Sequence, residues 1–559
     1  MNSETSTPMV EPIAAEAPES PGFFRKWVPL LVMSLALVIM LLDTTILNVT
    51  MGTIIVDLDT TLQKFQWVVT AYSLMMASFT ITGGRLGDIF GRKKTFVIGA
   101  IIFALGSFIT SISQTVGVMI IGEAIIAGAG AALMLPATAT LLRTSYQGHD
   151  RRLAFGVWGA IAAAAAALGP LVGGWLTTNY SWRWAFRINV FIVLLLVLGS
   201  RLIRETRDSN KNPTLDWVGV GLSAFGLFCL VFGFIEASTY GWLHEKQPFS
   251  VFGREFQLGG YSATPMFIAI GILVLALFAF WQNHMRLSGR APLVSLKLFR
   301  NTLFVTGTSI SAIIALGQAG LSFSVPVYLQ AVLKLDPIHT GLAMIPLTAS
   351  ILVAAPFSAI LSKHVAPRHI IQVGIVTDAA GFLVMRHSLH VGASPWDLAP
   401  GMCLFGVGMG LMIAQTSNLA LSSVAAEETG EASGVNTSMR LTGSALGSAI
   451  LGAVMISALA ANLVHGVGTS AIIPENLKAP ISKAVETRTS AFEFGGGDSI
   501  KESGLSAPIK EELSALSNRA TVDAGRTALA YGAALVLSAL LVSTRLPRTN
   551  TIENERLAA

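Results

Sequence analysis

Apolar runs separated by short polar segments extend along almost the whole chain. Fourteen of these runs have about 20 residues, the length that an α-helix needs to cross the hydrocarbon core of a bilayer. A single membrane-spanning segment satisfies its own backbone hydrogen bonds only as a helix. We therefore predict an all-α integral membrane protein with transmembrane helices near residues 27–50, 66–84, 95–112, 117–142, 153–177, 184–203, 216–236, 265–282, 303–327, 340–361, 369–386, 397–421, 434–461 and 526–545.

The polar stretches between the runs divide the chain into parts. A long one at 462–525 predicts an outer loop with helical patches around 480–488 and 508–519, and another at 237–264 predicts a loop that could form a hairpin. We expect a tail at 1–26, a six-helix bundle at 27–203, a linking helix pair with loops at 204–300, a second six-helix bundle at 301–546 and a tail at 547–559.

Composition supports the membrane assignment. Of the 559 residues, 52% are hydrophobic and only 12% are charged, whereas about 25% is usual in soluble proteins. The two cysteines, Cys229 and Cys403, lie inside apolar runs, which excludes a disulfide framework. The first run is too long for a signal-peptide core and lacks a convincing cleavage site.

Basic residues occur in alternate loops, which sets the orientation. Cytoplasmic loops of membrane proteins are enriched in Lys and Arg, so we expect both termini in the cytoplasm. The formal net charge of +5 follows from these loops and does not indicate a nucleic-acid partner. The acidic inner loop with Glu427, Glu428 and Glu431 is an exception that does not reverse the orientation.

The string GRLGDIFGRKK at 84–94 lies between the second and third runs. Its glycines should let the backbone bend sharply, and Asp88 is within reach of Arg92 and of the amino end of the next helix, where a carboxylate is favoured. On charge alone it is a positive-inside loop, but the string closely resembles the loop between helices two and three of major facilitator superfamily transporters. The resemblance implies a gating loop made of Gly84, Arg85, Gly87, Asp88, Gly91, Arg92 and Lys93.

Further motifs make the resemblance narrower. LLDTTILNVTMGTI at 41–54, WVVTAY at 67–72, SWRW at 181–184 and GEASGVNTSMRLTGSALGSAI at 430–450 resemble fourteen-helix drug:proton antiporters of the EmrB/QacA type. This implies two pseudo-symmetric six-helix bundles that work by alternating access in a cell membrane, in a pattern that looks bacterial. The family's antiporter motif falls on Gly169, Pro170, Gly173 and Gly174, where ordinary helix packing is the alternative explanation.

Two acids lie deep inside predicted spans, where a charge is expensive and usually faces a cavity or a partner. Asp43 is in the first span, and the resemblance assigns this position a role in proton coupling. A structural carboxylate bound by Thr44, Thr45 or Asn48 is the alternative. Asp378, in the eleventh span, is the second candidate for contacting a cation.

The fourth span departs from the family pattern. Relatives carry Arg-x-x-Gln before Gly-x-Gly-Ala-Ala, and that Arg is thought to assist proton release. Residues 128–132 match the second part, but Ala124 and Ala127 occupy the Arg and Gln positions. Glu123 stands one position earlier, so in an α-helix it would point about 100° away. It is either a second proton or cation site, which would raise the proton affinity of Asp43 or Glu123 if the two share a cavity, or an acid near the outer end that reaches water.

Other polar residues inside the spans could line a cavity or hold helices together. We expect Arg440 either to compensate an acid or to tie helices together. The remaining candidates for a cavity or a charge partner are Asn48, Gln318, Gln415 and Asn418.

The sequence therefore predicts proton-coupled efflux of lipophilic, cationic compounds by alternating access. Protons, a small-molecule substrate and the bilayer are the expected partners, with an envelope partner conceivable at 462–525. Neither a catalytic cluster nor a metal site nor a P-loop stands out in the sequence, so we expect neither an enzyme nor a cofactor. An exporter of an endogenous amphiphile (a siderophore, lipid or peptide) and a non-transporting sensor or scaffold stay open as alternatives.

Overall fold

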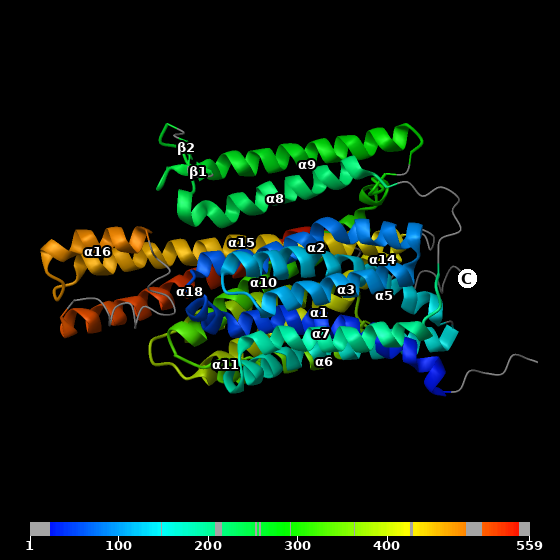
Figure 1. Cartoon of the computed structure of the whole chain (residues 1–559), viewed down its shortest axis with the longest axis horizontal. Helices are drawn as coiled ribbons and strands as arrows, with labels where there is room; N and C mark the ends of the chain where they lie inside the picture. The colour runs from blue at the N-terminus through cyan, green and yellow to red at the C-terminus, as the bar shows by residue number, and fades with distance from the viewer. Residues whose placement is uncertain are drawn as a thin grey trace, which may run out of the picture.

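The computed structural model describes residues 23–146, 148–206, 215–251, 254–256, 259–290, 292–362, 364–424, 429–487 and 506–546. Its helices run side by side along the long axis of the molecule (Figure 1). The end that carries α16 (Glu475–Thr487) is called the α16 end below. The opposite end, where the chain turns between α2 and α3, is called the loop end.

The first half of the chain forms one helical bundle. Its elements are α1 (Phe23–Asp57), α2 (Leu62–Phe90), α3 (Arg92–Ser111), α4 (Val116–Met119), η1 (Ile120–Ala127), α5 (Gly128–Ser145), α6 (Gly148–Asn179), α7 (Trp182–Gly199) and η2 (Ser200–Leu202). Side-chain caps define several starts, because the hydroxyls of Thr61, Thr115 and Ser181 each accept a backbone N–H of the following turn.

A peripheral helix pair follows. Figure 1 shows α8 (Trp217–Tyr240) and α9 (Ala263–Leu287) along one side of the molecule, with α9 outermost. Between them β1 (Phe249–Val251) and β2 (Arg254–Phe256) pair antiparallel, with Phe249 opposite Phe256, so the hairpin expected between these spans is present. Leu74 of α2, Ile235 of α8 and Ala449 of α15 share one apolar cluster, so α8 covers a line where the two halves meet.

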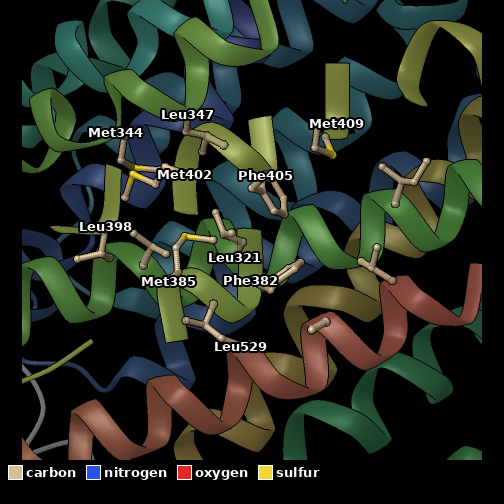
Figure 2. Close-up of a cluster of buried hydrophobic side chains, with 14 of the residues drawn as sticks. Leu321, Met344, Leu347, Phe382, Met385, Leu398, Met402, Phe405, Met409 and Leu529 are labelled. Atoms are coloured by element: carbon tan, nitrogen blue, oxygen red, sulfur yellow. The ribbon is translucent and has the colours of Figure 1, made fainter. Parts of the chain in front are cut away.

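The second half forms another bundle. Its elements are η3 (Leu298–Arg300), α10 (Thr302–Ala331), α11 (Pro337–Ala343), α12 (Ile345–Leu361), α13 (Pro367–Ser388), η4 (Pro395–Leu398), α14 (Ala399–Ser422), α15 (Thr429–Thr469), α16 and α18 (Ala507–Ser543). Figure 2 shows its core, where Phe382, Met385, Met402 and Phe405 meet Leu529 of α18.

All fourteen predicted spans fall on helical segments, although twelve helices of the described residues are long and apolar enough to cross a membrane by length and composition. The two outside that set are α2 and α6, with 29 and 32 residues, and both lie within the helical assembly. The number of membrane crossings that the structure supports by this measure is therefore twelve.

The expected outer loop at 462–525 is more helical than its polar sequence indicated. α15 continues to Thr469 and α18 begins at Ala507, so these two helices project beyond the rest of the bundle (Figure 1). Leu477 and Ile481 of α16 pack against them in a cluster with Val467 of α15 and Leu513 of α18. The predicted patches at 480–488 and 508–519 fall on α16 and α18, while 488–505 lies outside the described residues.

Close glycine contacts repeat between the two halves. A Cβ atom at Gly130 of α5 would meet the backbone of Phe103 and Gly99 in α3, and a Cβ at Gly408 of α14 would meet the backbone of Asp378 and Gly374 in α13. The pair α3/α5 therefore packs in the same way as the pair α13/α14. Because the two pairs occupy corresponding places in their bundles, this packing is the structural trace of an internal repeat, as expected for two pseudo-symmetric bundles.

Candidate functional site

Asp43 and Glu123 meet in the interior of the first half. Their side chains are 1% and 0% exposed, and the two carboxyl groups interact directly. α1 supplies Asp43, and the helical segment η1 supplies Glu123. The structure therefore brings the two predicted acids together, and the alternative in which Glu123 reaches water is wrong.

Neutral side chains supply hydrogen bonds to this acid pair. The Nδ2 atom of Asn189 in α7 donates to Oδ1 of Asp43 at 2.9 Å and lies 3.3 Å from Oγ of Ser107 in α3. Oγ1 of Thr110 donates to Oε2 of Glu123 at 3.1 Å. These three residues are not among the predicted site residues, although a polar residue inside an apolar span was an available signal.

The second oxygen of each acid has no donor among the described residues. Oδ2 of Asp43 and Oε1 of Glu123 are both buried and lack a hydrogen-bond partner among the described residues. Two ionised carboxylates in contact and away from water repel each other strongly. A proton bound between them would remove this repulsion and would satisfy both oxygens.

The helix that carries Glu123 has an unusual hydrogen-bond register. η1 is a π-helix, and the backbone N–H of Gly128 donates to the carbonyl of Glu123, five residues earlier. A π-turn accommodates one more residue than an α-turn. Glu123 therefore takes the angular place that Ala124 would take in a regular α-helix, and the expectation that Glu123 points about 100° away is wrong.

The internal repeat identifies the extra residue independently. Gly122 packs against the backbone of Gly106 in α3, as Gly401 packs against Gly381 in α13. From Gly122 to Gly130 there are eight positions, while the corresponding step from Gly401 to Gly408 has seven. The first half thus holds a single-residue insertion in the turn that positions Glu123.

Asp378 is isolated from this acid pair. It lies in the second half, on α13, and is 0% exposed. Neither of its carboxylate oxygens has a hydrogen-bond partner among the described residues. The structure therefore leaves Asp378 as a single buried acid that is packed against Gly408 of α14 and lies in the other half from Asp43.

The predicted gating loop is mostly helical. Gly84, Arg85 and Gly87 belong to α2, so only Gly91, with a φ of 108°, makes the sharp bend. Asp88 forms the expected ion pair with Arg92 at 3.0 Å.

The amino end of α3 beside this bend is occupied by an acid other than Asp88. The two carboxylate oxygens of Glu205 accept the backbone N–H groups of Lys93 and Lys94 at 3.0 and 3.1 Å. A carboxylate is favoured at this position by the helix dipole.

The small residues of the antiporter motif allow close packing on two sides of α6. A Cβ atom at Gly169 would meet Thr45, and one at Gly173 would meet Ile46, both in α1. A Cβ at Gly174 would instead meet the backbone of Pro337 and Ile338 in α11, which belongs to the second half. Close packing by these glycines therefore connects α1 with the boundary between the two halves.

Pro170 takes part in the same boundary. Its carbonyl oxygen lies where a side chain on Gly341 of α11 would have to pass. Pro170 and Gly174 thus place α6 directly against α11 at this boundary.

Two buried glutamines connect the halves on the side of the α16 end. The side chain of Gln330 in α10 accepts the N–H of Gly52 and donates to the carbonyl of Val49, both at 2.8 Å, in α1. Gln66 of α2 donates to the carbonyl of Ser448 in α15 at 2.6 Å. Both side chains are less than 10% exposed, and sequence analysis did not select them.

The predicted cavity residues behave differently from one another. Gln318 of α10 and Arg440 of α15 are exposed although both lie well inside their helices, whereas Asn48 is half-buried with a buried Oδ1 that has no partner among the described residues. Gln415 is buried and donates to Ser358 of α12 at 2.9 Å, so it holds two helices together.

The side chain of Asn418, the fifth predicted cavity residue, lies outside the described residues. Among the residues that the structure describes, no three or more His, Cys, Asp and Glu side chains form a group that could hold a metal ion.

Two repeated bundles of membrane-length helices that carry buried acids form the architecture of a membrane transporter. The sequence matches the Major Facilitator Superfamily over residues 33–448. The chain therefore belongs to this superfamily.

Several relatives are known by function. The chain is 30% identical over 444 residues to a tetracenomycin C resistance and export protein of Streptomyces glaucescens, with 79% of this chain and 78% of the relative covered. It is 29% identical over 524 residues to the multidrug efflux pump LfrA of Mycolicibacterium smegmatis, with 93% and 95% covered. These similarities place its relatives among antibiotic and multidrug exporters.

Solved structures support the fold. A bacterial homologue of the human lysosomal transporter Spinster, in an inward-facing and occupied conformation, matches with a TM-score of 0.60 at 15% identity. The match covers 94% of this chain and 97% of that chain. At this low identity the similarity concerns the arrangement of helices alone.

Proposed function

We propose that this protein exports lipophilic compounds across a bacterial cell membrane in exchange for protons, by alternating access. The observation that carries the proposal is the acid pair, because Asp43 and Glu123 are in contact and neither reaches solvent. The names of the tetracenomycin C exporter and of LfrA support efflux as the direction of transport. The motifs favour the fourteen-helix EmrB/QacA type, in which α2 and α6 would cross the membrane as well and α8 and α9 would form the linking pair.

The acid pair would couple transport to the proton gradient. A single proton held between Asp43 and Glu123 neutralises one charge and bridges the two unpartnered oxygens. A membrane potential of 100 mV is worth about 2.3 kcal/mol per charge moved, which sustains roughly a 50-fold substrate gradient, since about 1.4 kcal/mol is tenfold. The gradient would therefore drive efflux without a nucleotide or other cofactor.

The conformation fits an inward-facing step of such a cycle. The glutamine and glycine contacts described above join the halves toward the α16 end, and Ser438 of α15 bonds Ala77 near the middle of α2. Arg440 is exposed within the span that begins at the loop end. With both termini in the cytoplasm, as the charged loops predict, the loop end faces the cytoplasm. The projecting parts of α15 and α18, with α16, would then lie on the outer side of the membrane. Contact of this region with an envelope partner stays a prediction.

Transport in proteoliposomes tests the proposal. Ethidium, rhodamine 123 and fluorescein would be followed under an imposed pH gradient with wild type, Asp43→Asn, Glu123→Gln and, as a matched buried-acid control, Asp378→Asn. We expect gradient-driven movement in wild type and Asp378→Asn, and at least a tenfold loss in the other two variants. Movement that ignores the gradient, or no movement of any dye by folded wild type, would contradict the proposal.

A further inference from the structure

Arg440 presents a charge inside the membrane-spanning part of the molecule. It follows the first residue of α15, Thr429, by 11 positions, which is about 16 Å along a helix. Despite this depth the side chain is exposed. A cation at such a depth faces protein or water and not lipid.

The neighbours of α15 show which way this exposed side chain points. Gly443 and Gly447 pack against backbone carbonyls of α10, and Ser438 donates to the carbonyl of Ala77 in α2 at 2.6 Å. Ala445 and Ala449 lie in the apolar cluster shared with α8 at the periphery. Arg440 lies about 60° from Gly443 and on the opposite side from Ala449, given 100° per residue. It therefore points away from α8, on the side of α15 that packs against α10.

The guanidinium group has no compensating partner among the residues that the structure describes. No hydrogen bond or ion pair joins Arg440 to any other residue that the structure describes, so its five N–H donors are available. Neither the compensating acid nor the tie between helices expected of Arg440 is found among the described residues.

A second exposed polar group lies on α10. Gln318 is also exposed and also lacks a hydrogen-bond partner among the described residues. In the register that pairs Ala312 with Gly443 and Leu316 with Gly447, Gln318 lies about 13 Å beyond Arg440 along the bundle. The two side chains could therefore meet different parts of one drug-sized molecule.

We propose that Arg440, assisted by Gln318, forms a substrate subsite and selects lipophilic compounds that carry an anionic group. The acids are hidden, since Asp43, Glu123 and Asp378 are each at most 1% exposed, and so a substrate meets the cation first. A guanidinium recognises carboxylate, sulfonate or phenolate oxygens through paired N–H donors. This inference rests on the proposed efflux function and replaces the expected cationic substrate with an anionic one.

Two dyes with the same ring system and opposite charges test this subsite. Fluorescein is an anionic xanthene and rhodamine 123 a cationic one, and fluorescence anisotropy would measure the binding of each to the purified full chain. The variants are Arg440→Gln, Arg440→Lys and, as a matched control on the projecting part of α18, Arg519→Gln, whose side chain is also exposed.

We expect wild type and Arg519→Gln to bind fluorescein at least tenfold more tightly than rhodamine 123. Arg440→Gln should lower the affinity for fluorescein tenfold or more and leave rhodamine 123 unchanged, while Arg440→Lys should keep part of the preference. Equal binding of fluorescein by wild type and Arg440→Gln, or no binding of fluorescein by folded wild type, would overturn the inference.

The same variants distinguish the subsite from the proposed function. If the subsite is wrong but the protein is a proton-coupled exporter, the pH gradient still drives rhodamine 123 or ethidium through wild type. If the preference for fluorescein is confirmed and no dye responds to the gradient, the subsite stands and proton coupling fails.

Discussion

At the scale of single residues, Asn189 is the polar neighbour that joins the acid pair to α3. Its amide donates to Asp43 and lies beside Ser107, while Thr110 donates to Glu123. These donors are neutral, so the net charge at the pair depends only on how many protons its two carboxyl groups carry. The number of protons on the pair therefore decides how much charge is buried in the first half.

Replacing Glu123 by Gln should make the stability of the protein less sensitive to pH. At alkaline pH wild type must either retain a proton that the unfolded chain releases or bury two contacting charges. If the pair retains one proton, the free energy of unfolding falls by about 1.4 kcal/mol for each unit by which the pH rises. A Gln side chain at position 123 donates to Asp43 at every pH.

Thermal unfolding in detergent between pH 6 and pH 9 measures this effect. The melting temperature of wild type should fall with rising pH more steeply than that of Glu123→Gln. Identical slopes for the two proteins would show that no proton is held by the pair.

The sequence indicated three buried acids, but it did not indicate that two of them are in contact. Asp43, Glu123 and Asp378 were visible as charges within apolar runs. Contact between the first two depends on helix packing and on a local backbone register, neither of which has a side-chain pattern. Gln66 and Gln330 were missed because an amide inside a span is common helix–helix glue, and only the structure shows that each bonds across the two halves.

At the scale of elements, the π-helix η1 decides where Glu123 points. Hydrophobic patterning predicted a helix over 117–142, and the helical segments from Val116 to Ser145 confirm it. The pattern carries no information on a single inserted residue, because every position from Ile120 to Ala127 except Gly122 and Glu123 is apolar. Because of that inserted residue, Glu123 lies at the angular position that the family pattern gives to residue 124.

Deletion of Ala124 should convert this turn to an α-helix. Glu123 would then lie four residues, instead of five, before the glycine that is now Gly128. The acid then keeps the same face, so we expect gradient-driven transport to stay within about threefold of wild type. Moving the acid by one position, with Glu123→Ala and Ala124→Glu together, keeps the insertion and turns the carboxyl away from Asp43.

Dye transport in proteoliposomes compares the two designs. We expect the variant with the shifted acid to transport the dye at least tenfold more slowly under the pH gradient, while the deletion variant retains activity. The reverse order, or equal loss in two well-folded variants, would contradict a positioning role for the π-turn.

At the scale of the whole molecule, the halves are held together toward the α16 end by contacts that a transport cycle must break. Gln330 binds the backbone of α1, Gln66 binds the backbone of α15, and α6 packs on α11 where Gly174 and Gly341 allow it. The division into two bundles and a linking pair follows from the count and spacing of apolar runs. The contacts between the bundles follow from shape complementarity, which the sequence does not display.

Leucine at Gly341 should open the α16 end. A side chain there would collide with the carbonyl of Pro170, so the closed arrangement becomes unfavourable and the population should shift toward separation by at least tenfold, or about 1.4 kcal/mol. Spin labels at Tyr180 and Val391, exposed residues of the two halves, would report a longer distance in a background without the two cysteines. Gly221→Leu, where a Cβ atom would meet open space, is the control that should leave the distance unchanged. An unchanged distance in a folded Gly341→Leu variant would contradict this assignment of the closed end.

Proton release on substrate binding is the most direct test of the central claim, that the Asp43–Glu123 pair carries the proton that drives export. A pH-indicator dye would record protons released when purified protein, in weakly buffered detergent solution, binds the dye with the highest measured affinity. We predict release from wild type and Asp378→Asn, and none from Asp43→Asn or Glu123→Gln in samples that still bind the substrate. Undiminished release from either pair variant would contradict the account.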